Sequence, residues 1–305
     1  MRLIQPSFEI LEQSPGLEGV YRQVELAARN CYRSEPVEGV SSKDFVDRMI
    51  KSQHLSTLEH GTVYLAIPMT TYAPEAVNTY IYNPYSKVNE CHDFIFTDRY
   101  GDKVSAWCVT TNLRVLVEND CLEDLEFLCE PTEFHERRVT VKFTSNIHFY
   151  KDITRHRPMS FAIESTRYCN YSKGKFGNEL TFIIPVWMDN IEYYKEYYGI
   201  PGGDEGIVRP SEDDGFYAYY LFLYSLLYAE EHYLGLIEHG WQAQQAAEVL
   251  PQATKADIIM TGFVSDWQHV FNLRTSIIAA TGKPHPEVSR LMDPLYEEFE
   301  TRHLI

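Results

Sequence analysis

One short segment of the chain combines clustered cationic side chains with a serine and a further arginine. Residues 155–157 read Arg-His-Arg, and after a seven-residue spacer residues 165–168 read Ser-Thr-Arg-Tyr. The formal net charge of the chain is −17, so cations are scarce, and adjacent arginines repel each other unless an anion lies between them. An arginine fork binds phosphate through two parallel hydrogen bonds. The segment therefore predicts a site for a phosphate-bearing ligand, against the alternative of weak surface ion pairs that a generic Arg-x-Arg forms.

The full pattern, Arg-His-Arg-x7-Ser continued by Ser-x-Arg-Tyr, resembles the signature of the flavin-dependent thymidylate synthases. Residues 54–60, His-Leu-Ser-Thr-Leu-Glu-His, are similar to the family's His-x-Thr/Ser-x-x-Glu-His element beside the flavin. Residues 272–274, Asn-Leu-Arg, are similar to the segment whose arginine contacts the uracil ring of dUMP. Taken alone, such histidines are usually a hydrogen-bonded pair, and such an arginine is usually a helix C-cap. The resemblance covers most of the chain outside 69–137.

The resemblance implies an enzyme that transfers a one-carbon unit from 5,10-methylenetetrahydrofolate to C5 of dUMP, giving dTMP. FAD reduced by NADPH would supply the hydride, and the family's sites are shared between the subunits of a homotetramer. Bond formation at C5 requires electron density in the uracil ring, and a fixed guanidinium stabilises the charge that develops as N3 ionises. The residue expected in this catalytic role is Arg274.

The resemblance also assigns binding roles to particular side chains. The set expected to bind dUMP is Asp152, Arg155, Ser165, Thr166, Arg167 and Arg274. The set expected to bind FAD is Ser56, Glu59, Arg155, His156, Arg157 and His269. His54 is expected to flank the flavin ring and the folate entry, and no residue is expected to bind a metal.

Several positions depart from the family pattern. Residues 162–163 are Ala-Ile where the family commonly has polar residues such as Asn-Glu, and Ala247 stands where an arginine often holds the dUMP phosphate. Residues 263–265 stand where the family often has Asn-x-Arg, and His285 is expected to restore a late family histidine displaced by an insertion. Two alternatives follow: a flavin- or nucleotide-binding relative with altered turnover, and a nucleic-acid-binding module that uses Arg-His-Arg as a phosphate clamp.

The cysteines do not suggest a nucleophile. The one Cys-His pair in the sequence, Cys91-His92, follows Glu90 and lacks the Pro-Cys-His setting of the thymidylate synthases that attack with a cysteine. Cys169 lies near Arg167 without a neighbouring base, and we interpret it as buried packing. The six cysteines form no C-x-x-C pair and show no zinc-ligand spacing, which indicates reduced thiols in a cytoplasmic protein.

The composition narrows the class of protein. A chain of 305 residues with 44% hydrophobic content suits one large domain or two small ones. A sequence pI near 5.1 argues against a nucleic-acid-binding surface. No apolar run approaches the ~18 residues that a membrane span requires, and no glycine-rich dinucleotide fingerprint follows a strand. We therefore expect a soluble, cytoplasmic protein that binds neither nucleic acid nor membrane.

The elements that would position these residues mix strands and long helices without regular alternation. This pattern favours an α+β fold with a mixed or antiparallel sheet packed against long helices. Strands are expected at 2–11, 62–68, 139–143 and 179–185, and helices at 18–32, 41–52, 147–154, 215–238, 241–250, 254–273 and 286–302. Residues 196–213 are expected to form a loop. The segment 69–137, with a hairpin around 99–102, has too few periodic apolar residues for its own core, so we expect an insertion in a single enzyme domain spanning 1–305.

Overall fold

An antiparallel sheet of four strands lies at the centre of the protein, in the order β2-β6-β9-β7. The computed structural model describes residues 1–69, 75–97, 100–200, 208–280 and 282–305. The four strands are β2 (Ser7–Leu11), β6 (Arg138–Asn146), β9 (Lys255–Phe263) and β7 (Ser160–Ile163). β6 and β9 pair along their whole length, from Arg138 opposite Phe263 to Asn146 opposite Lys255. The α+β fold expected from the sequence is confirmed.

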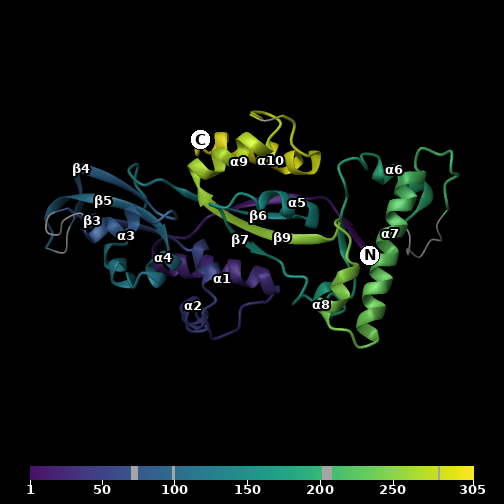
Figure 1. The fold of residues 1–305 in the computed structure, drawn as a ribbon, viewed down its shortest axis with the longest axis horizontal. Coiled ribbons are helices and arrows are strands. Elements are labelled where there is room, and N and C mark those ends of the chain that lie inside the picture. The colour runs from purple at the N-terminus through teal and green to yellow at the C-terminus, as the bar shows by residue number, and fades with distance from the viewer. Residues whose placement is uncertain (70–74, 98–99, 201–207, 281) are drawn as a thin grey trace.

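Helices cover both faces of this sheet (Figure 1). One face carries α5 (Ile147–Ile153), α9 (Val264–Arg274) and α10 (Pro286–Thr301), and the other carries α1 (Gly16–Tyr32), against which α2 (Ser42–Lys51) packs. Ile258 and Met260 of β9 point into the main core, while Ile259 between them contacts Ala27 of α1. β9 is therefore buried on both faces, which explains why its sequence is a continuous apolar run.

A second sheet has the order β3-β5-β4. Its strands are β3 (Thr62–Pro68), β5 (Lys103–Asn112) and β4 (Lys87–Thr97), and beside them lie α3 (Glu75–Ile81), α4 (Leu113–Glu118) and the 3₁₀ helix η2 (Leu122–Phe127). β4 and β5 form the expected hairpin, with Thr97 opposite Lys103. Residues 98–99 of that hairpin lie outside the described residues.

The apolar residues of the segment 69–137 are buried in a core that they share with residues outside the segment. Val109 and Leu116 of this segment are fully buried, and they pack in one cluster with Leu65 of β3 and with Val20 and Val24 of α1. The core is shared with a helix that lies outside the segment. Periodicity within the segment therefore underestimated how much apolar surface it buries.

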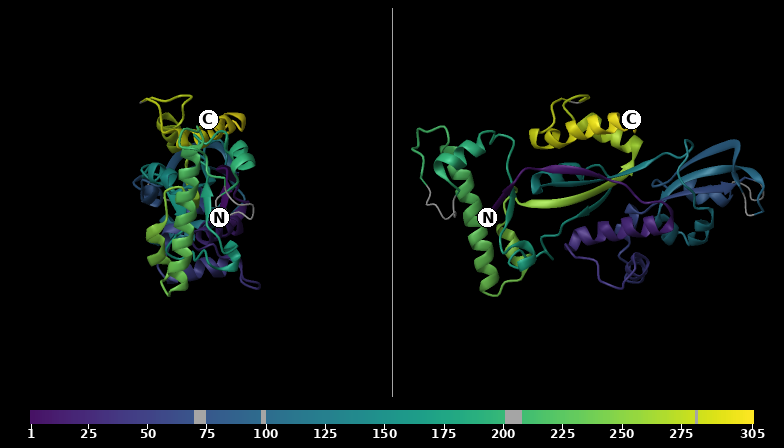
Figure 2. Two further views of the ribbon diagram at one scale, coloured as in Figure 1. Left: turned by 90° about the vertical axis from the view of Figure 1, so that its right-hand side faces the viewer. Right: turned by 180° about the vertical axis from the view of Figure 1, so that it is seen from behind.

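The end of the protein opposite the second sheet is helical (Figures 1 and 2). It contains α6 (Ile191–Tyr198), α7 (Tyr217–Glu238), α8 (Ala243–Ala246) and the 3₁₀ helix η4 (Ala247–Val249). A small parallel pair, β1 (Arg2–Ile4) and β8 (Thr181–Ile183), joins this end to the central sheet. Two further 3₁₀ helices are η1 (Leu55–His60) and η3 (Gly174–Phe176). No helix among the described residues has the length and apolar character that crossing a membrane requires.

Four of the expected elements were wrong in detail. The helix expected at 254–273 is a strand followed by a helix, β9 and α9, because a short buried apolar run is consistent with either type. The helix expected at 241–250 is a single turn with a 3₁₀ extension, since Pro251 follows at once. The strand expected at 2–11 is two strands in different sheets. The loop expected at 196–213 begins inside α6, and its residues 201–207 lie outside the described residues.

Candidate active site

The ends of α5 and α9 meet in one hydrogen-bonded cluster. Arg274, the last residue of α9, donates from Nε to His156 Nε2 at 3.0 Å and from Nη2 to the Asp152 carbonyl oxygen at 2.9 Å. Asn146 caps α5 by accepting a hydrogen bond from the Phe149 amide at 2.8 Å, which fixes the helix that carries Asp152. Three residues expected to act on the substrate or the cofactor are thus brought together from distant parts of the sequence.

His156 is the buried member of this cluster. The pKa of His156 is lowered to about 4, mainly by burial and to a smaller extent by the nearby Arg274 and His269. Because Nε2 accepts the hydrogen bond from Arg274, the proton of the neutral ring lies on Nδ1. The ring of His269 meets that of His156 edge-on, with centroids 6.0 Å apart. At neutral pH, therefore, His156 orients the Arg274 guanidinium and adds no positive charge to the Arg-His-Arg group.

A second neutral histidine lies inside the protein. His60 Nδ1 is 2.8 Å from Thr261 Oγ1. The pKa of His60 is lowered to about 3, mainly by burial and to a smaller extent by the charge of Arg138. For His60 and for His156 the pKa in the folded state is below the unfolded value near 6.5. The unfolded chain therefore takes up these protons first as the pH falls.

We expect the stability of the protein to decline below pH 6.5. The contribution of each neutral histidine is fully present above pH 6.5 and is lost as the pH falls toward 4, on the order of 2 kcal/mol for each histidine by pH 4.5. Urea unfolding at several pH values between 4.5 and 7 measures this slope. A His60→Asn variant should show a flatter dependence on pH, and the same slope as the unaltered protein would contradict this account.

Arg155 and Arg157 lie on the exposed loop between α5 and β7, on either side of the buried His156. In the part of the chain that the structure describes, neither guanidinium is paired with a carboxylate. Arg167, also exposed, lies over the ring of Tyr168 at 5.6 Å and likewise has no carboxylate partner among the described residues. In so acidic a chain, three exposed arginines without acidic partners leave their donors available to an anionic ligand.

Residues 165–168, called the Ser165 strip below, lie at the other end of β7, against the C-terminus of α1. The Ser165 amide donates to the Cys31 carbonyl oxygen at 3.0 Å, and the Arg167 amide donates to Ser165 Oγ at 3.3 Å. The rings of Tyr32 and Tyr168 lie 5.0 Å apart. The strip is therefore held by the backbone of α1, and Ser165 and Thr166 are half-buried.

A pocket of about 430 Å³ opens at the same end of α1. His54 and Ser56 line it, together with Cys31 and Tyr32. Glu59 does not line this pocket; its carboxylate accepts a hydrogen bond from Arg114 Nη1 at 2.5 Å. The structure therefore brings His54 and Ser56 next to the Ser165 strip, while Glu59 orients Arg114, which also lines the pocket.

One chain does not bring all the expected site residues into one place. The residues that Arg274 contacts, Asp152 and His156, come just before β7 in the sequence, and the Ser165 strip comes just after β7. The four residues of β7 alone span roughly 10 Å. Arg155 and Arg157 lie at the first end, whereas Ser165 and Arg167 lie at the second. The chain thus presents two groups of candidate binding residues.

Sequence reasoning missed a buried charge network beside the Ser165 strip. Lys255 Nζ lies 2.7 Å from Glu164 Oε2 and 2.8 Å from Asp257 Oδ2, and Arg33 Nη1 lies 2.5 Å from the same Asp257 oxygen. The Glu164 amide donates to the Asp257 carbonyl oxygen at 2.8 Å, so the network fixes the residue before Ser165. The signal was present: Lys255 and Asp257 alternate, as residues on one face of a strand do, within a segment that was taken for a helix.

The thiols nearest these groups are poor nucleophiles. Burial raises the pKa of Cys169 to about 11, and it also raises the pKa of Cys31. Cys91 is fully buried in the second sheet. Since the thiolate is the nucleophile, none of these cysteines is set up to attack a pyrimidine ring near neutral pH. In the described part of the chain no three His, Cys, Asp or Glu side chains are grouped as metal ligands.

Two departures from the family pattern have structural partners. Ser265 Oγ donates to Glu136 Oε1 at 2.5 Å, and Phe263 is buried beside Arg138, whose guanidinium lies 5.5 Å from its ring. His285 caps α10 by accepting from the Glu287 amide at 3.2 Å. These three side chains are therefore engaged in the fold itself.

Comparison with known proteins gives one match by sequence and several by structure. The sequence model of the family described as thymidylate synthase complementing protein matches residues 130–303. No curated protein matches the chain. Among solved structures, the UMP/dUMP methylase PolB from Streptomyces cacaoi bound with 5-Br UMP is similar at 16% identity and a TM-score of 0.44, covering 99% of this chain and 92% of that chain. Thymidylate Synthase X (ThyX) from Helicobacter pylori with FAD and dUMP is similar at 14% identity and a TM-score of 0.38, covering 98% of this chain and 95% of that chain.

Proposed function

The chain belongs to the thymidylate synthase complementing protein family, and we propose that it converts dUMP to dTMP as a flavin-dependent thymidylate synthase. The proposal rests on how the signature segment is folded. Exposed arginines without acidic partners among the described residues lie at both ends of β7, and a hydrogen bond to His156 fixes Arg274. The raised thiol pKa values support a mechanism without a cysteine nucleophile. We further propose that the enzyme works in the cytoplasm as one domain with an insertion at 69–137.

Arg274 has the catalytic role in this proposal. Its fork is held from two sides, and it would stabilise the negative charge that develops on the uracil ring as N3 ionises. Arg155, Ser165 and Arg167 would hold the nucleotide through its phosphate and sugar, with Asp152 and Thr166 beside them. Because the holding hydrogen bonds exist before substrate binds, little reorganisation is required during the reaction.

The residues present fit a flavin carrying two phosphates. The unpaired guanidinium groups of Arg155 and Arg157 offer donors for its phosphates, and the pocket beside His54 and Ser56 offers a partly apolar wall. His156, which holds Arg274, and His269 beside it would complete the flavin-binding set, and Glu59 would act through Arg114. When bound, FAD reduced by NADPH would supply the hydride that converts the one-carbon unit from 5,10-methylenetetrahydrofolate into a methyl group.

We propose that the active enzyme is a homotetramer. The support lies in the separation of the binding groups: Arg155 and Arg157 stand at one end of β7 and Ser165 and Arg167 at the other. A second copy of the chain would bring Arg155 and Arg157 of one subunit against Ser165 and Arg167 of another. Complete sites would then form only on assembly.

The visible absorption spectrum of the purified protein tests the proposal. The protein is loaded with FAD, and spectra are recorded before and after anaerobic addition of NADPH, with and without dUMP. Flavin bands that bleach with NADPH, and faster with dUMP, would tie cofactor, reductant and substrate to one site. A protein that does not take up FAD would overturn the proposed function.

A flavin-binding relative without turnover is the second candidate. The observation in its favour is that Ser265 and Phe263 serve the fold, and that Ala247 supplies no cation where the family often has arginine. Tritium release from [5-³H]dUMP separates the two candidates. Bound FAD with neither bleaching nor tritium release would favour this second function.

A further inference from the structure

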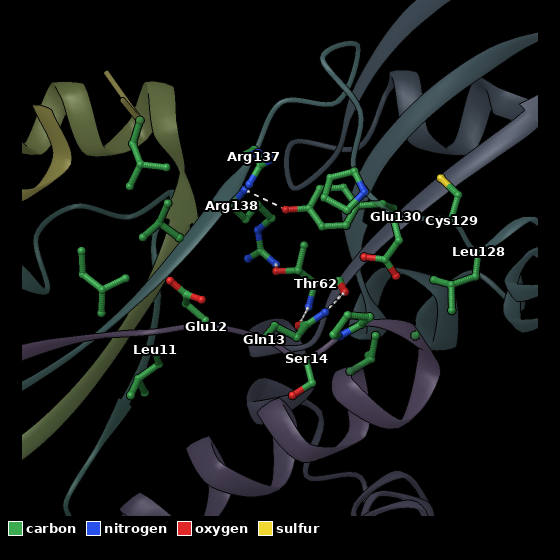
Figure 3. A pocket seen from close by; sticks show the side chains of 18 of the residues that line it. Leu11, Glu12, Gln13, Ser14, Thr62, Leu128, Cys129, Glu130, Arg137 and Arg138 are labelled. Atoms are coloured by element: carbon green, nitrogen blue, oxygen red, sulfur yellow. Dashed lines mark hydrogen bonds between the residues drawn. The ribbon is translucent and has the colours of Figure 1, made fainter. Parts of the chain in front are cut away.

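A pocket of about 690 Å³ lies between the central sheet and the second sheet (Figure 3), and none of its lining residues belongs to either group of candidate site residues. Its walls come from β2 and the turn after it, from β3, from the segment 128–131, and from the start of β6. Its volume is in the range of pockets that hold small organic molecules, which are often built where two structural units meet. The pocket therefore has the size of a ligand site, and its lining residues have no role in the proposed enzyme activity.

Arg138 is the unusual residue of this pocket. It is the first residue of β6, and its Nη1 donates to the Glu59 carbonyl oxygen at 3.0 Å and to Thr62 Oγ1 at 3.3 Å. Its Nε is buried and has no hydrogen-bond partner. Burial lowers the pKa of Arg138 to about 10. Within the described part of the chain, no carboxylate lies at ion-pair distance from this guanidinium, although the charges of Glu59 and Asp266 act on it and partly oppose the lowering of its pKa.

An arginine buried without an acidic partner is costly, because a charge taken out of water is normally compensated by a counter-ion. Lys255 in the same protein shows the usual solution, with two carboxylates within 3 Å of its ammonium group. Around Arg138, a carbonyl oxygen, a hydroxyl, the Phe263 ring and the more distant charges of Glu59 and Asp266 offset part of the charge, but none is a directly paired anion. An oxyanion in the pocket would supply that direct partner.

The rest of the pocket favours an anion attached to an apolar body. Arg137 adds a second, exposed cation to the lining, and Glu12 is already paired with Arg302 at 2.9 Å. Glu130 is exposed, so its charge is screened by solvent. Leu11, Val139 and Leu304 are among the apolar residues that complete the walls, and Leu11 is labelled in Figure 3.

We propose that this pocket binds a small organic oxyanion, with Arg138 engaging the charged group and the aliphatic walls holding the apolar body. A carboxylate and a phosphate monoester share the required chemistry. Arg138 also holds the Glu59 carbonyl oxygen, so the occupied pocket would join the two sheets through one guanidinium.

Calorimetric titration of the full-length protein with four probes tests this proposal, with no flavin or nucleotide present. The probes are benzoate, phenyl phosphate, benzamide as the neutral isostere of benzoate, and inorganic phosphate. We expect benzoate or phenyl phosphate to bind at least about tenfold more tightly than benzamide, as a hydrogen bond to a charged group predicts. The tighter of the two anions identifies whether a carboxylate or a phosphate monoester is preferred.

Three variants connect binding to this pocket. Arg138→Met and Arg137→Glu should each weaken the anionic probe about tenfold or more, whereas Arg22→Met, on the outer surface of α1, should leave binding unchanged. Arg137 is exposed, so its variant decides the matter if Arg138→Met does not fold. Equal binding of benzoate and benzamide, inorganic phosphate binding as tightly as phenyl phosphate, or unchanged binding by Arg137→Glu would overturn the proposal. Because FAD and dUMP are absent, these results are independent of the proposed catalytic function.

Discussion

Replacing Arg274 with alanine should lower the rate of dTMP formation at least about a hundredfold while FAD stays bound. Removing one fixed donor from a site of developing negative charge typically costs a factor of 10²–10³ in rate. The side chain does not line the pocket beside His54 and Ser56, so flavin binding should persist. Single-turnover formation of dTMP, with the flavin spectrum recorded in parallel, measures both quantities.

Arg274→Lys provides the matched control. Lysine keeps the charge but loses the fork that contacts His156 and Asp152 together, so we expect only partial recovery of the rate. In Arg274→Ala the pKa of His156 should also rise, because Arg274 is one of the groups that lower it. An NMR titration of His156 reports this change separately from the rate. Turnover close to that of the unaltered enzyme would remove Arg274 from the catalytic role.

Replacing Lys255 with methionine should destabilise the protein by about 3–5 kcal/mol, the usual result of removing one partner from a buried ion pair. The variant leaves Glu164 and Asp257 buried without the cation that lies between them, and the side chains of these two residues are only 1% and 4% exposed. Urea unfolding at pH 7 measures the free energy of unfolding. Because Glu164 precedes Ser165, we also expect the Michaelis constant for dUMP to rise.

Lys142→Met is the matched control for this substitution. Lys142 reaches the same Asp257 oxygen at 3.8 Å and is 33% exposed, so its loss should cost below about 1 kcal/mol. Burial by itself would raise the pKa of Asp257, but Lys255, Thr144 and Lys142 together hold it below its ordinary value. That contribution is present above the unfolded pKa near 3.9 and is lost as the pH falls through the folded pKa. Equal destabilisation by the two variants would contradict a special role for Lys255.

Much of the candidate site could be predicted because its residue types are dictated by chemistry. Arginines in an acidic chain indicated an anion site, and the structure leaves Arg155, Arg157 and Arg167 without acidic partners among the described residues. The contact between Arg274 and His156 could not be predicted, because it depends on how α9 lies against the end of α5. The neutral state of His156 also depends on burial, which no local pattern records.

The main error in the fold came from a run of apolar residues in β9. Ile258, Ile259 and Met260 are buried toward both faces of the sheet, so they lack the alternation that identifies an exposed strand. Lys255 and Asp257, the charged residues of this strand, are paired with each other in the folded protein, and Asp257 is also paired with Arg33. The burial of apolar residues in the segment 69–137 could not be read from the segment itself, because their packing partners lie outside it, in α1 and β3 among others.

The order of strands in the central sheet has a consequence for how the protein reaches its native state. In the described structure, β2 pairs with β6, β6 with β9 and β9 with β7, and each pairing joins segments that are distant along the chain. Bringing such segments together loses chain entropy before any contact is gained, whereas the hairpin of β4 and β5 closes locally. The hairpin is therefore expected to form early and the central sheet late. The pairing of α5 with α9, and with it the fixed Arg274, would be among the last features to appear during folding.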